Sequence, residues 1–407
     1  MCSYFSHIWH WLTVARRLKA YVRIVSWTAT FVLLIACSSA AGGSTPANER
    51  QQLQAASVAD QGVFVGWEKQ WESIIAAAKQ ESEVVIYGPP GAAYRRAFVD
   101  AFEKDYPGIK VSFVGLTGAD IAPRILAERQ AGKFAADLHI GGTTTITNVL
   151  KPVGALDPIT PLLILPEVKD SSRWFGNQLW YADNEQQFNI IFEGTASSVG
   201  AVNTRLIDPA KFTSYWDILD PQFKGKIVVG DMRKPGPNTI HLRFIWATES
   251  LGQQYLQKLI RDMDVTITDD SRQAVDWIAQ GRNPIAIFIE STEVDEAAKQ
   301  GLPVSNIDSR RFKEGFPLTA GFGSVAVMNG RPHPNATIVY VNWLLSREGQ
   351  LAYQKEVGRN SLRIDIPKDM VSRWAIPIEE TRVFPGNLER YLDIEKAARD
   401  FVVKNLN

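Results

Sequence analysis

The amino-acid sequence predicts an α/β protein of two lobes, each with a mostly parallel sheet flanked by helices. Short apolar segments with the length of buried strands alternate with segments whose apolar residues recur at helical spacing. This alternation predicts βαβ units, in which neighbouring strands run parallel. Two such series occur, joined by an extended stretch, and 407 residues are enough for both.

The first series begins with a helix and continues through three strands. Trp71, Ile74, Ile75 and Ala78 recur at the spacing of one helix face. The strands are expected at 83–88, 110–115 and 136–142, with helices at 94–106 and 120–130 between them. In parallel sheets ligands bind beyond the carboxyl ends of the strands. The sequence therefore predicts one rim formed by the segments 87–91, 115–120 and 141–145.

The second series repeats the alternation after the extended stretch. Strands are expected at 198–204, 225–230, 265–268 and 284–289, and helices at 216–219, 239–249, 251–263 and 271–280. The sequence shows no repeat of fixed period and no heptad pattern. The second series therefore predicts a second α/β lobe.

The first 36 residues have the features of a secretory signal. Four basic residues and no acid precede the apolar segment 24–36. About 13 residues are too few to cross a hydrocarbon core of about 30 Å as an ordinary helix. An uncleaved anchor helix is the alternative, and a start downstream of Met1 stays open. We expect residues 1–36 to be removed as a signal peptide.

The segment from Leu34 to Cys37 resembles the lipobox of bacterial lipoproteins, in which a small residue precedes a lipidated cysteine. Cys2 lies in the predicted signal, so Cys37 would be the only cysteine of the mature chain. Residues 37–62 are small and polar, which is typical of a flexible tether. We therefore expect a lipid anchor at Cys37 and an extracytoplasmic location, in the periplasm or at the cell surface.

The charge balance argues against nucleic-acid partners. The whole chain carries 44 basic and 44 acidic residues, and without its first 36 residues it carries 40 basic and 44 acidic ones. A mildly acidic chain has no electrostatic attraction to phosphate backbones or to anionic lipid surfaces. We expect no nucleic-acid partner, and contact with the membrane only through the lipid anchor.

Three segments of the second half resemble the extracellular solute-binding proteins of bacterial ABC importers, family 1. The similarity lies in VNTRLIDPAKFTSYWDILDPQFKGKIVVGD (202–231), IAQGRNPIAIF (278–288) and GFGSVAVMNGRPHPNATIVYVNWLLSREGQ (321–350). The subgroup that they resemble contains ferric-iron and aminoethylphosphonate binders. Their order and spacing, over about 66–365, carry the resemblance.

The resemblance implies a two-lobed periplasmic-binding-protein type II fold, with hinge strands between the lobes and a small ligand in the cleft. Because the chain of such proteins returns late to the first lobe, we expect lobe 1 at 66–185 and 310–350, and lobe 2 at 186–309 and 351–407. The resemblance also implies a monomer that delivers its solute to ABC permease subunits. The alternative is a sensory binding protein that presents its ligand to a membrane receptor.

Candidate ligand-binding residues of the first lobe lie on the predicted rim. They are Tyr87, Gly91, Gly142, Thr143 and Thr144. Glycines let the backbone approach a ligand, and threonine hydroxyls add donors to the free N–H groups of a helix N-terminus. Simple capping by Thr143 and a half-buried Tyr87 phenol are the alternatives without a ligand.

Candidate residues of the second lobe are Arg233, Asn238, Thr239 and Glu290. Arg233 could hold a carboxylate or phosphoryl group bidentately. Asn238 and Thr239 could cap the next helix and face the cleft, and Glu290 would suit a cation or an amine. A solvated role is the alternative for Arg233 and Glu290. The threonines of the rim together with Arg233 favour a small anionic or zwitterionic organic solute.

Ferric iron is the alternative ligand within the same family. Relatives that bind it use adjacent tyrosines, because phenolates are hard anionic ligands, and this pair should lie just after Ala286. The chain has Phe288-Ile289-Glu290 there and contains no Tyr-Tyr dipeptide. His139, His241 and His333 are far apart in the sequence. We therefore predict no metal site and no cofactor.

The sequence contains no catalytic motif of the common kinds. Gly321-Phe-Gly-Ser324 lacks the Gly-x-Ser-x-Gly spacing of a nucleophile elbow. A Walker loop, a His-Glu-x-x-His segment and a Gly-x-Gly-x-x-Gly turn between strand and helix do not occur. We therefore expect a binding protein and not an enzyme.

Overall fold

The computed structural model describes residues 66–234 and 236–406. The expected signal peptide (1–36), the lipidation site Cys37 and the expected tether (37–62) lie outside the described residues. None of the helices that the structure describes has both the length and the hydrophobicity of a membrane-spanning segment.

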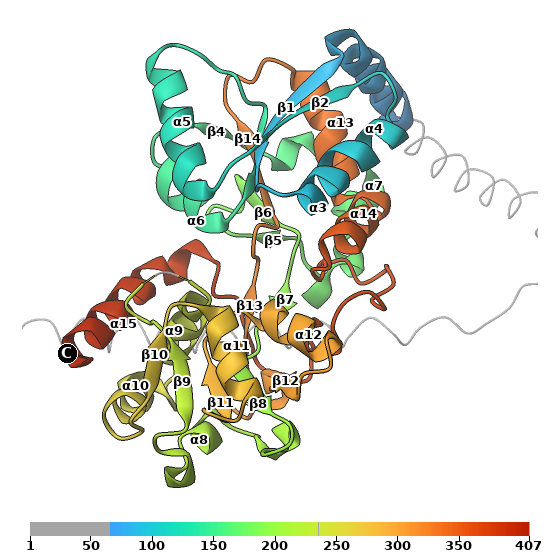
Figure 1. Cartoon of the computed structure of the whole chain (residues 1–407). Coiled ribbons are helices and arrows are strands. Elements are labelled where there is room, and N and C mark those ends of the chain that lie inside the picture. The colour runs from blue at the N-terminus through green and yellow to red at the C-terminus, as the bar shows by residue number, and fades with distance from the viewer. Residues whose placement is uncertain (1–65, 235, 407) are drawn as a thin grey trace, which may run out of the picture. The chain divides into compact units, whose positions relative to one another are not determined.

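The first sheet has seven strands in the order β2-β1-β3-β14-β6-β5, with β4 beside β14 (Figure 1). Its parallel part is β1 (Glu83–Gly88), β2 (Lys110–Gly115) and β3 (Leu138–Gly141). Its antiparallel part is β14 (Ser324–Met328), β6 (Asn189–Ile191), β5 (Trp180–Tyr181) and β4 (Leu156–Asp157). The strands are short and mostly buried, as expected for a sheet covered by helices.

Helices cover this first sheet. They are the helix 66–81, α3 (Ala92–Arg95), α4 (Ala101–Asp105), α5 (Gly118–Gln130), α6 (Thr143–Thr145), α7 (Pro166–Lys169), α13 (Pro334–Leu345) and α14 (Arg347–Val357). A π-helical turn at Arg96–Asp100 joins α3 to α4. The core between helices and sheet is aromatic, and the ring of Phe102 lies 5.1 Å from that of Trp343.

The second sheet has five strands in the order β10-β9-β11-β8-β12. These are β8 (Gly200–Asn203), β9 (Ile227–Gly230), β10 (Thr266–Thr268), β11 (Ile285–Ile287) and β12 (Val304–Asn306). Its helices are α8 (Tyr215–Ile218), α9 (Asn238–Ala247), α10 (Gly252–Arg261), α11 (Ser271–Ala279), α12 (Ser291–Lys299) and α15 (Leu392–Asn405). A separate apolar core lies in this part, which makes it a second lobe.

A small sheet links the two lobes (Figure 1). It consists of β7 (Thr195–Ala196), β13 (Phe316–Thr319) and β15 (Val383–Phe384), in the order β15-β13-β7. Along the chain, β7 lies between β6 of the first sheet and β8 of the second, and β13 lies between β12 and β14. Two connections between the lobes therefore pair side by side, which is the arrangement of a hinge.

The expected two-lobed α/β fold is confirmed, but both sheets are mixed rather than mostly parallel. The antiparallel strands β6, β8 and β14 adjoin the connections between the lobes, and no crossover helix sets their direction. The expected lobe boundaries stay a prediction. Hydrogen bonding places β6 in the first sheet, α14 packs against α3, and α15 packs against α9.

Candidate ligand-binding site

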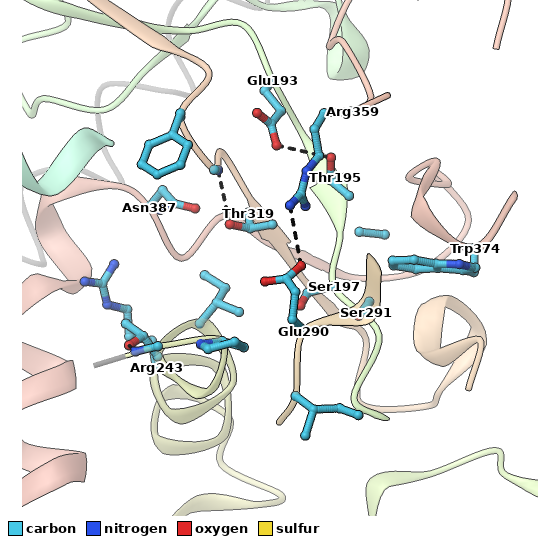
Figure 2. A pocket seen from close by; sticks show the side chains of 18 of the residues that line it. Glu193, Thr195, Ser197, Arg243, Glu290, Ser291, Thr319, Arg359, Trp374 and Asn387 are labelled. Atoms are coloured by element: carbon cyan, nitrogen blue, oxygen red, sulfur yellow. Dashed lines mark hydrogen bonds and ion pairs between the residues drawn. The ribbon is translucent and has the colours of Figure 1, made fainter. Parts of the chain in front are cut away.

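A cavity of about 260 Å³ lies where the connections between the lobes run side by side. Its lining comes from both connections, from the starts of α9 and α12, and from the chain after α14. A cavity at a hinge can be opened and closed by movement of the lobes, because its walls belong to both. Figure 2 shows the polar side chains that point into it.

Glu193 is the buried carboxylate of this cavity. It lies on the first connection, between β6 and β7, and is 1 % exposed. The hydroxyl of Tyr353 on α14 donates a hydrogen bond to it, and the Thr195 hydroxyl lies 3.4 Å away. Burial raises the pKa of Glu193 to about 7, although the charge of Arg359 acts to lower it. The carboxyl group therefore changes its charge near neutral pH.

The second connection packs directly on Glu193 through glycines. A Cβ atom at Gly321 would lie 2.6 Å from the Glu193 Oε1, and a Cβ atom at Gly323 would lie 2.1 Å from the Glu193 Cβ. Gly321 also has a φ of +49°, which L-residues with side chains rarely adopt. The segment Gly321-Phe-Gly-Ser324 is therefore the place where the second connection passes over the buried acid.

Arg359 is the cationic residue beside this acid. It follows Gly358, which ends α14 in the left-handed conformation. The next residues are fixed to the first connection, because the Asn360 side chain donates to the Gly194 carbonyl at 2.8 Å and the Leu362 N–H donates to the Phe192 carbonyl at 2.8 Å. Arg359 is thus held at the hinge by the backbone around it.

The guanidinium of Arg359 reaches the second lobe. Its Nη2 donates to the Oε1 of Glu290, the residue before α12, at 3.4 Å. Burial acts to lower the pKa of Arg359, but the negative charges of Glu193 and Glu290 outweigh it and raise this pKa. Figure 2 shows Arg359 between the two carboxylates. One cation therefore compensates two acids.

The start of α9 forms another wall. Thr239 lines the cavity, and its hydroxyl accepts hydrogen bonds from the Gly236 N–H at 3.2 Å and from Arg399 at 3.1 Å. One turn later, Arg243 is buried and donates to the Gly386 carbonyl at 2.8 Å and to Glu395 at 2.6 Å. Arg243 also lines the cavity, and its charge is compensated by Glu395.

Aromatic residues complete the lining. Tyr94 and Phe322 are in edge-to-face contact, with ring centroids 5.9 Å apart. Trp374 also lines the cavity and donates from its Nε1 to Asp295 of α12 at 3.1 Å. Burial, together with the charge of Glu193, raises the pKa of the Tyr94 phenol. The phenol therefore stays protonated at neutral pH.

Of the residues expected from the sequence in the second lobe, Thr239 and Glu290 line the cavity. Arg233 and Asn238 are not among its lining residues. Arg233 donates to Asp231 at 2.8 Å, which lowers the pKa of that acid. The buried Asn238 amide donates to the Asp231 carbonyl at 3.0 Å.

The residues expected from the first lobe lie outside the cavity lining. The buried Tyr87 hydroxyl donates to Glu128 at 2.8 Å. Gly91 precedes α3, and Thr144 lies within α6. Gly142 adjoins the second connection, since a Cβ atom there would lie 3.8 Å from the Gly321 carbonyl oxygen. The buried Thr143 hydroxyl accepts from Asn387, a lining residue, at 3.5 Å.

Glu193 and Arg359 are not among the ligand-binding residues expected from the sequence. The signal for Glu193 is a single acid directly after the apolar segment 190–192. The signal for Arg359 is weaker, since this residue only follows the glycine that ends a helix and lies outside the three quoted segments. Neither signal indicates that the two residues meet, because 166 positions separate them in the numbering.

Metal ligands of the usual kinds do not cluster in the described part of the chain. Residues 66–234 and 236–406 contain no group of three or more His, Cys, Asp or Glu side chains placed to hold one ion. The acidic and phenolic residues that line the cavity are Glu193, Glu290 and Tyr94.

The fold and the cavity at its hinge define a two-lobed binding protein. A family model described as "Bacterial extracellular solute-binding protein" matches residues 87–351, and the chain belongs to this family. The family expected from the segments 202–231, 278–288 and 321–350 is thereby confirmed. It is a family of extracytoplasmic transport proteins that bind small molecules and work with ABC permeases.

Solved structures of similar fold are periplasmic binding proteins. AfuA from Actinobacillus pleuropneumoniae, with fructose-6-phosphate bound, is 18% identical with a TM-score of 0.55, over 80% of this chain and 98% of AfuA. Iron-bound HitA from Pseudomonas aeruginosa is 18% identical with a TM-score of 0.56, over 78% of this chain and 99% of HitA. IdiA (FutA) from Trichodesmium, with iron and citrate, is 15% identical with a TM-score of 0.62, over 79% of this chain and 98% of IdiA.

These likenesses show the fold and leave the ligand of this chain open. A search of curated proteins finds no significant match.

Proposed function

We propose that this protein captures a small anionic or zwitterionic solute at Arg359 and delivers it to the permease subunits of an ABC importer. The observation that carries the ligand class is Arg359, whose guanidinium faces the cavity and makes a long hydrogen bond of 3.4 Å to Glu290. A guanidinium has five N–H donors in a planar fork that matches a carboxylate or a phosphoryl group. Among the described residues, Glu290 accepts the one side-chain hydrogen bond of Arg359, which leaves most of these donors for a ligand.

The surroundings of Arg359 suit a ligand that also carries a cationic or hydroxyl group. Glu290 is partly exposed and would accept a hydrogen bond from an ammonium group once the ligand anion has taken Arg359. The side chains of Thr195 and Ser197 line the same cavity and offer hydroxyls. Of the residues expected from the sequence, Thr239 and Glu290 belong to the proposed site.

The volume and the walls limit the ligand to a small molecule. A cavity of about 260 Å³ accommodates a metabolite of modest size. Tyr94, Phe322 and Trp374 provide apolar surfaces against which a carbon skeleton can pack. The proposed ligand is thus a compact organic anion or zwitterion, held by its charged groups and by aromatic side chains.

Binding would favour the closed arrangement of the lobes, because the ligand contacts residues from both. Arg359 is held at the hinge and Glu290 precedes a helix of the second lobe. A ligand that binds both sides stabilises closure by its differential affinity for that state. The closed form would then dock on the permease.

A screen with a shape readout tests this function. The purified protein is mixed in turn with amino acids, dicarboxylates, phosphate esters, neutral sugars and ferric citrate, and its thermal stability and small-angle scattering are measured. A tight ligand raises the melting temperature by mass action and reduces the radius of gyration. We expect both effects with an anion or a zwitterion. A response only to neutral sugars would contradict the ligand class, and a ligand that leaves the scattering unchanged would contradict closure.

Ferric iron is the second candidate, because two solved structures of similar fold contain iron. Against it, burial raises the pKa of the Tyr94 phenol, and the chain lacks a tyrosine pair. Titration with ferric citrate separates the two, because a phenolate bound to Fe(III) produces a visible charge-transfer band. We expect no such band.

The location and the route of delivery complete the proposal. A protein lipidated at Cys37 and joined to its anchor by residues 37–62 would stay at the membrane while its folded part, a monomer, captures solute. A sensory role is the alternative, in which a membrane receptor takes the place of the permease. Uptake of labelled ligand into cells, compared with cells that lack the protein, distinguishes import from sensing.

A further inference from the structure

We propose that an anion bound at Arg359 is taken up together with one proton, and that this proton resides on the buried carboxylate of Glu193. The inference rests on the proposed function, because it requires a negatively charged ligand group at Arg359. It adds a second binding event at the same site, which makes the affinity for the anion depend on pH.

One cation, Arg359, is shared by two carboxylates that differ in their exposure to solvent. Arg359 lies between Glu193 and Glu290 (Figure 2). The side chain of Glu290 is 38% exposed, whereas Glu193 is 1% exposed. When a ligand anion takes the guanidinium, Glu290 can turn to solvent or to a cationic group of the ligand. Glu193 is buried and cannot turn to solvent.

Glu193 is fixed in place from several sides. The backbone of the second connection lies against its side chain, as the 2.1 Å approach of a Cβ atom at Gly323 to the Glu193 Cβ indicates. Its own backbone pairs with Ser361 in an isolated antiparallel bridge, and Tyr353 donates to its carboxylate. A buried charge that cannot move must be compensated where it lies or be neutralised by a proton.

One positively charged group faces Glu193 and can compensate its negative charge. The charged and titratable groups that face it are Tyr94 from α3, Tyr353 from α14, Arg359 after α14, and Glu290 before α12. Of these, only Arg359 is positive. Burial raises the pKa of both tyrosines, so they are already protonated at neutral pH and cannot accept the proton.

The direction of the coupling follows from these charges. Burial holds the pKa of Glu193 at about 7 in the free protein, while the charge of Arg359 keeps it from rising further. A ligand anion on Arg359 opposes that charge, so the pKa of Glu193 is higher in the complex than in the free protein. Binding above neutral pH therefore takes up a proton, and affinity falls as pH rises.

Calorimetric titration and proton counting test the coupling. The probes are sulfate, succinate and L-glutamate, whose anionic groups stay ionised between about pH 7 and pH 9. We expect the Kd of the tightest probe to rise about tenfold per pH unit above about pH 7. In an unbuffered salt solution at about pH 8, mixing of protein and probe should take up about one proton from the solution for each anion bound.

Matched variants assign the proton to its residue. Glu193→Gln should bind the same probe with a Kd that no longer depends on pH and without proton uptake. Glu290→Gln, the control on the same arginine, should keep the proton uptake. Tyr353→Phe, which removes a hydrogen bond that lowers the pKa of Glu193, should move the onset of the pH dependence upward.

The outcomes separate the inference from the proposed function. Binding of a probe without proton uptake, or uptake that persists in Glu193→Gln, would overturn the inference and leave the anion site intact. Failure of all three probes to bind the wild-type protein would overturn the proposed ligand class and the inference with it.

Discussion

The Nη2 atom of Arg359 lies 3.4 Å from the Oε1 atom of Glu290, and this contact joins the hinge to the second lobe across the cavity. Arg359 belongs to the chain that pairs with the first connection, and Glu290 ends the segment before α12. In the structure, Glu290 thus accepts from one nitrogen of the guanidinium that a ligand anion would bind. A ligand must compete with Glu290, so the affinity of the site depends on the balance between these two partners.

Replacement of Arg359 by alanine should weaken binding of an anionic ligand about 100-fold, because a buried charge-assisted pair contributes roughly 2–5 kcal/mol. Arg359→Lys should keep part of the affinity, since lysine retains the charge but loses the planar fork. Isothermal titration with the ligand from the screen measures both changes.

Arg233→Ala is the control for this prediction. Arg233 pairs with Asp231 and does not line the cavity. Its replacement should change the Kd about twofold or less, as expected for an exposed ion pair. A large loss with Arg233→Ala would instead support the ligand-binding role that the sequence predicted for this residue.

Substitution of Gly321 by alanine should lower the free energy of unfolding by about 2–4 kcal/mol. The new Cβ atom would lie 2.6 Å from the carboxylate of Glu193, which Tyr353 holds, and the φ of +49° is unfavourable for alanine. Chemical denaturation measures the change.

Gly132→Ala provides the matched comparison, because Gly132 has a φ of +70° and no neighbouring atom within 4 Å of the position that a Cβ atom would take. This variant should lose about 1 kcal/mol from its backbone conformation alone. Equal losses at the two positions would show that Gly321 does not need the space beside Glu193.

The buried acid should give the protein a distinctive pH dependence of stability. The pKa of Glu193 is raised by burial to about 7, so the folded state binds a proton more tightly than the unfolded chain. Its contribution to stability is complete below about pH 4.5 and is lost as pH rises to about 7, a change of about 3 kcal/mol. Glu193→Gln should therefore gain stability relative to wild type over this range.

Urea denaturation of both proteins at several pH values measures this difference. Subtraction of the two curves removes the contributions of all other titrating groups. A difference that stays constant from acidic to neutral pH would contradict a raised pKa of Glu193.

The predicted lipid anchor gives a cellular test. Cys37→Ser should release the protein from the membrane fraction and abolish its labelling by a fatty-acid probe, because no other cysteine remains in the expected mature chain. Cys2→Ser is the control and should change neither, since that residue lies in the predicted signal. Membrane retention of Cys37→Ser would contradict lipidation and favour an uncleaved anchor helix.

Much of the fold could be read from local pattern. The first two strands are expected at 83–88 and 110–115, and the structure has them at Glu83–Gly88 and Lys110–Gly115. Helix α11 is expected at 271–280 and observed at Ser271–Ala279. Such elements follow from residues that are near one another in the chain, because periodic burial and capping are local properties.

The directions of the strands depended on long-range connections. A run of βαβ units predicts parallel neighbours, but β6 and β14 adjoin the connections to the second lobe and pair antiparallel in the first sheet. No residue within these strands indicates that direction. It follows from the path of the chain between lobes.

The sequence by itself determined the two α/β lobes and the family, because periodicity and ordered motifs carry that information. The export signal and the lipidation site at Cys37 stay predictions from composition and motif. It also identified Thr239 and Glu290, which stand where loops meet helix starts, as candidate ligand residues. Only the tertiary structure decided that Arg359 and Glu193 meet at the hinge. Their encounter requires both connections and the chain after α14 to converge, and a buried acid takes its raised pKa from neighbours that are distant in the sequence.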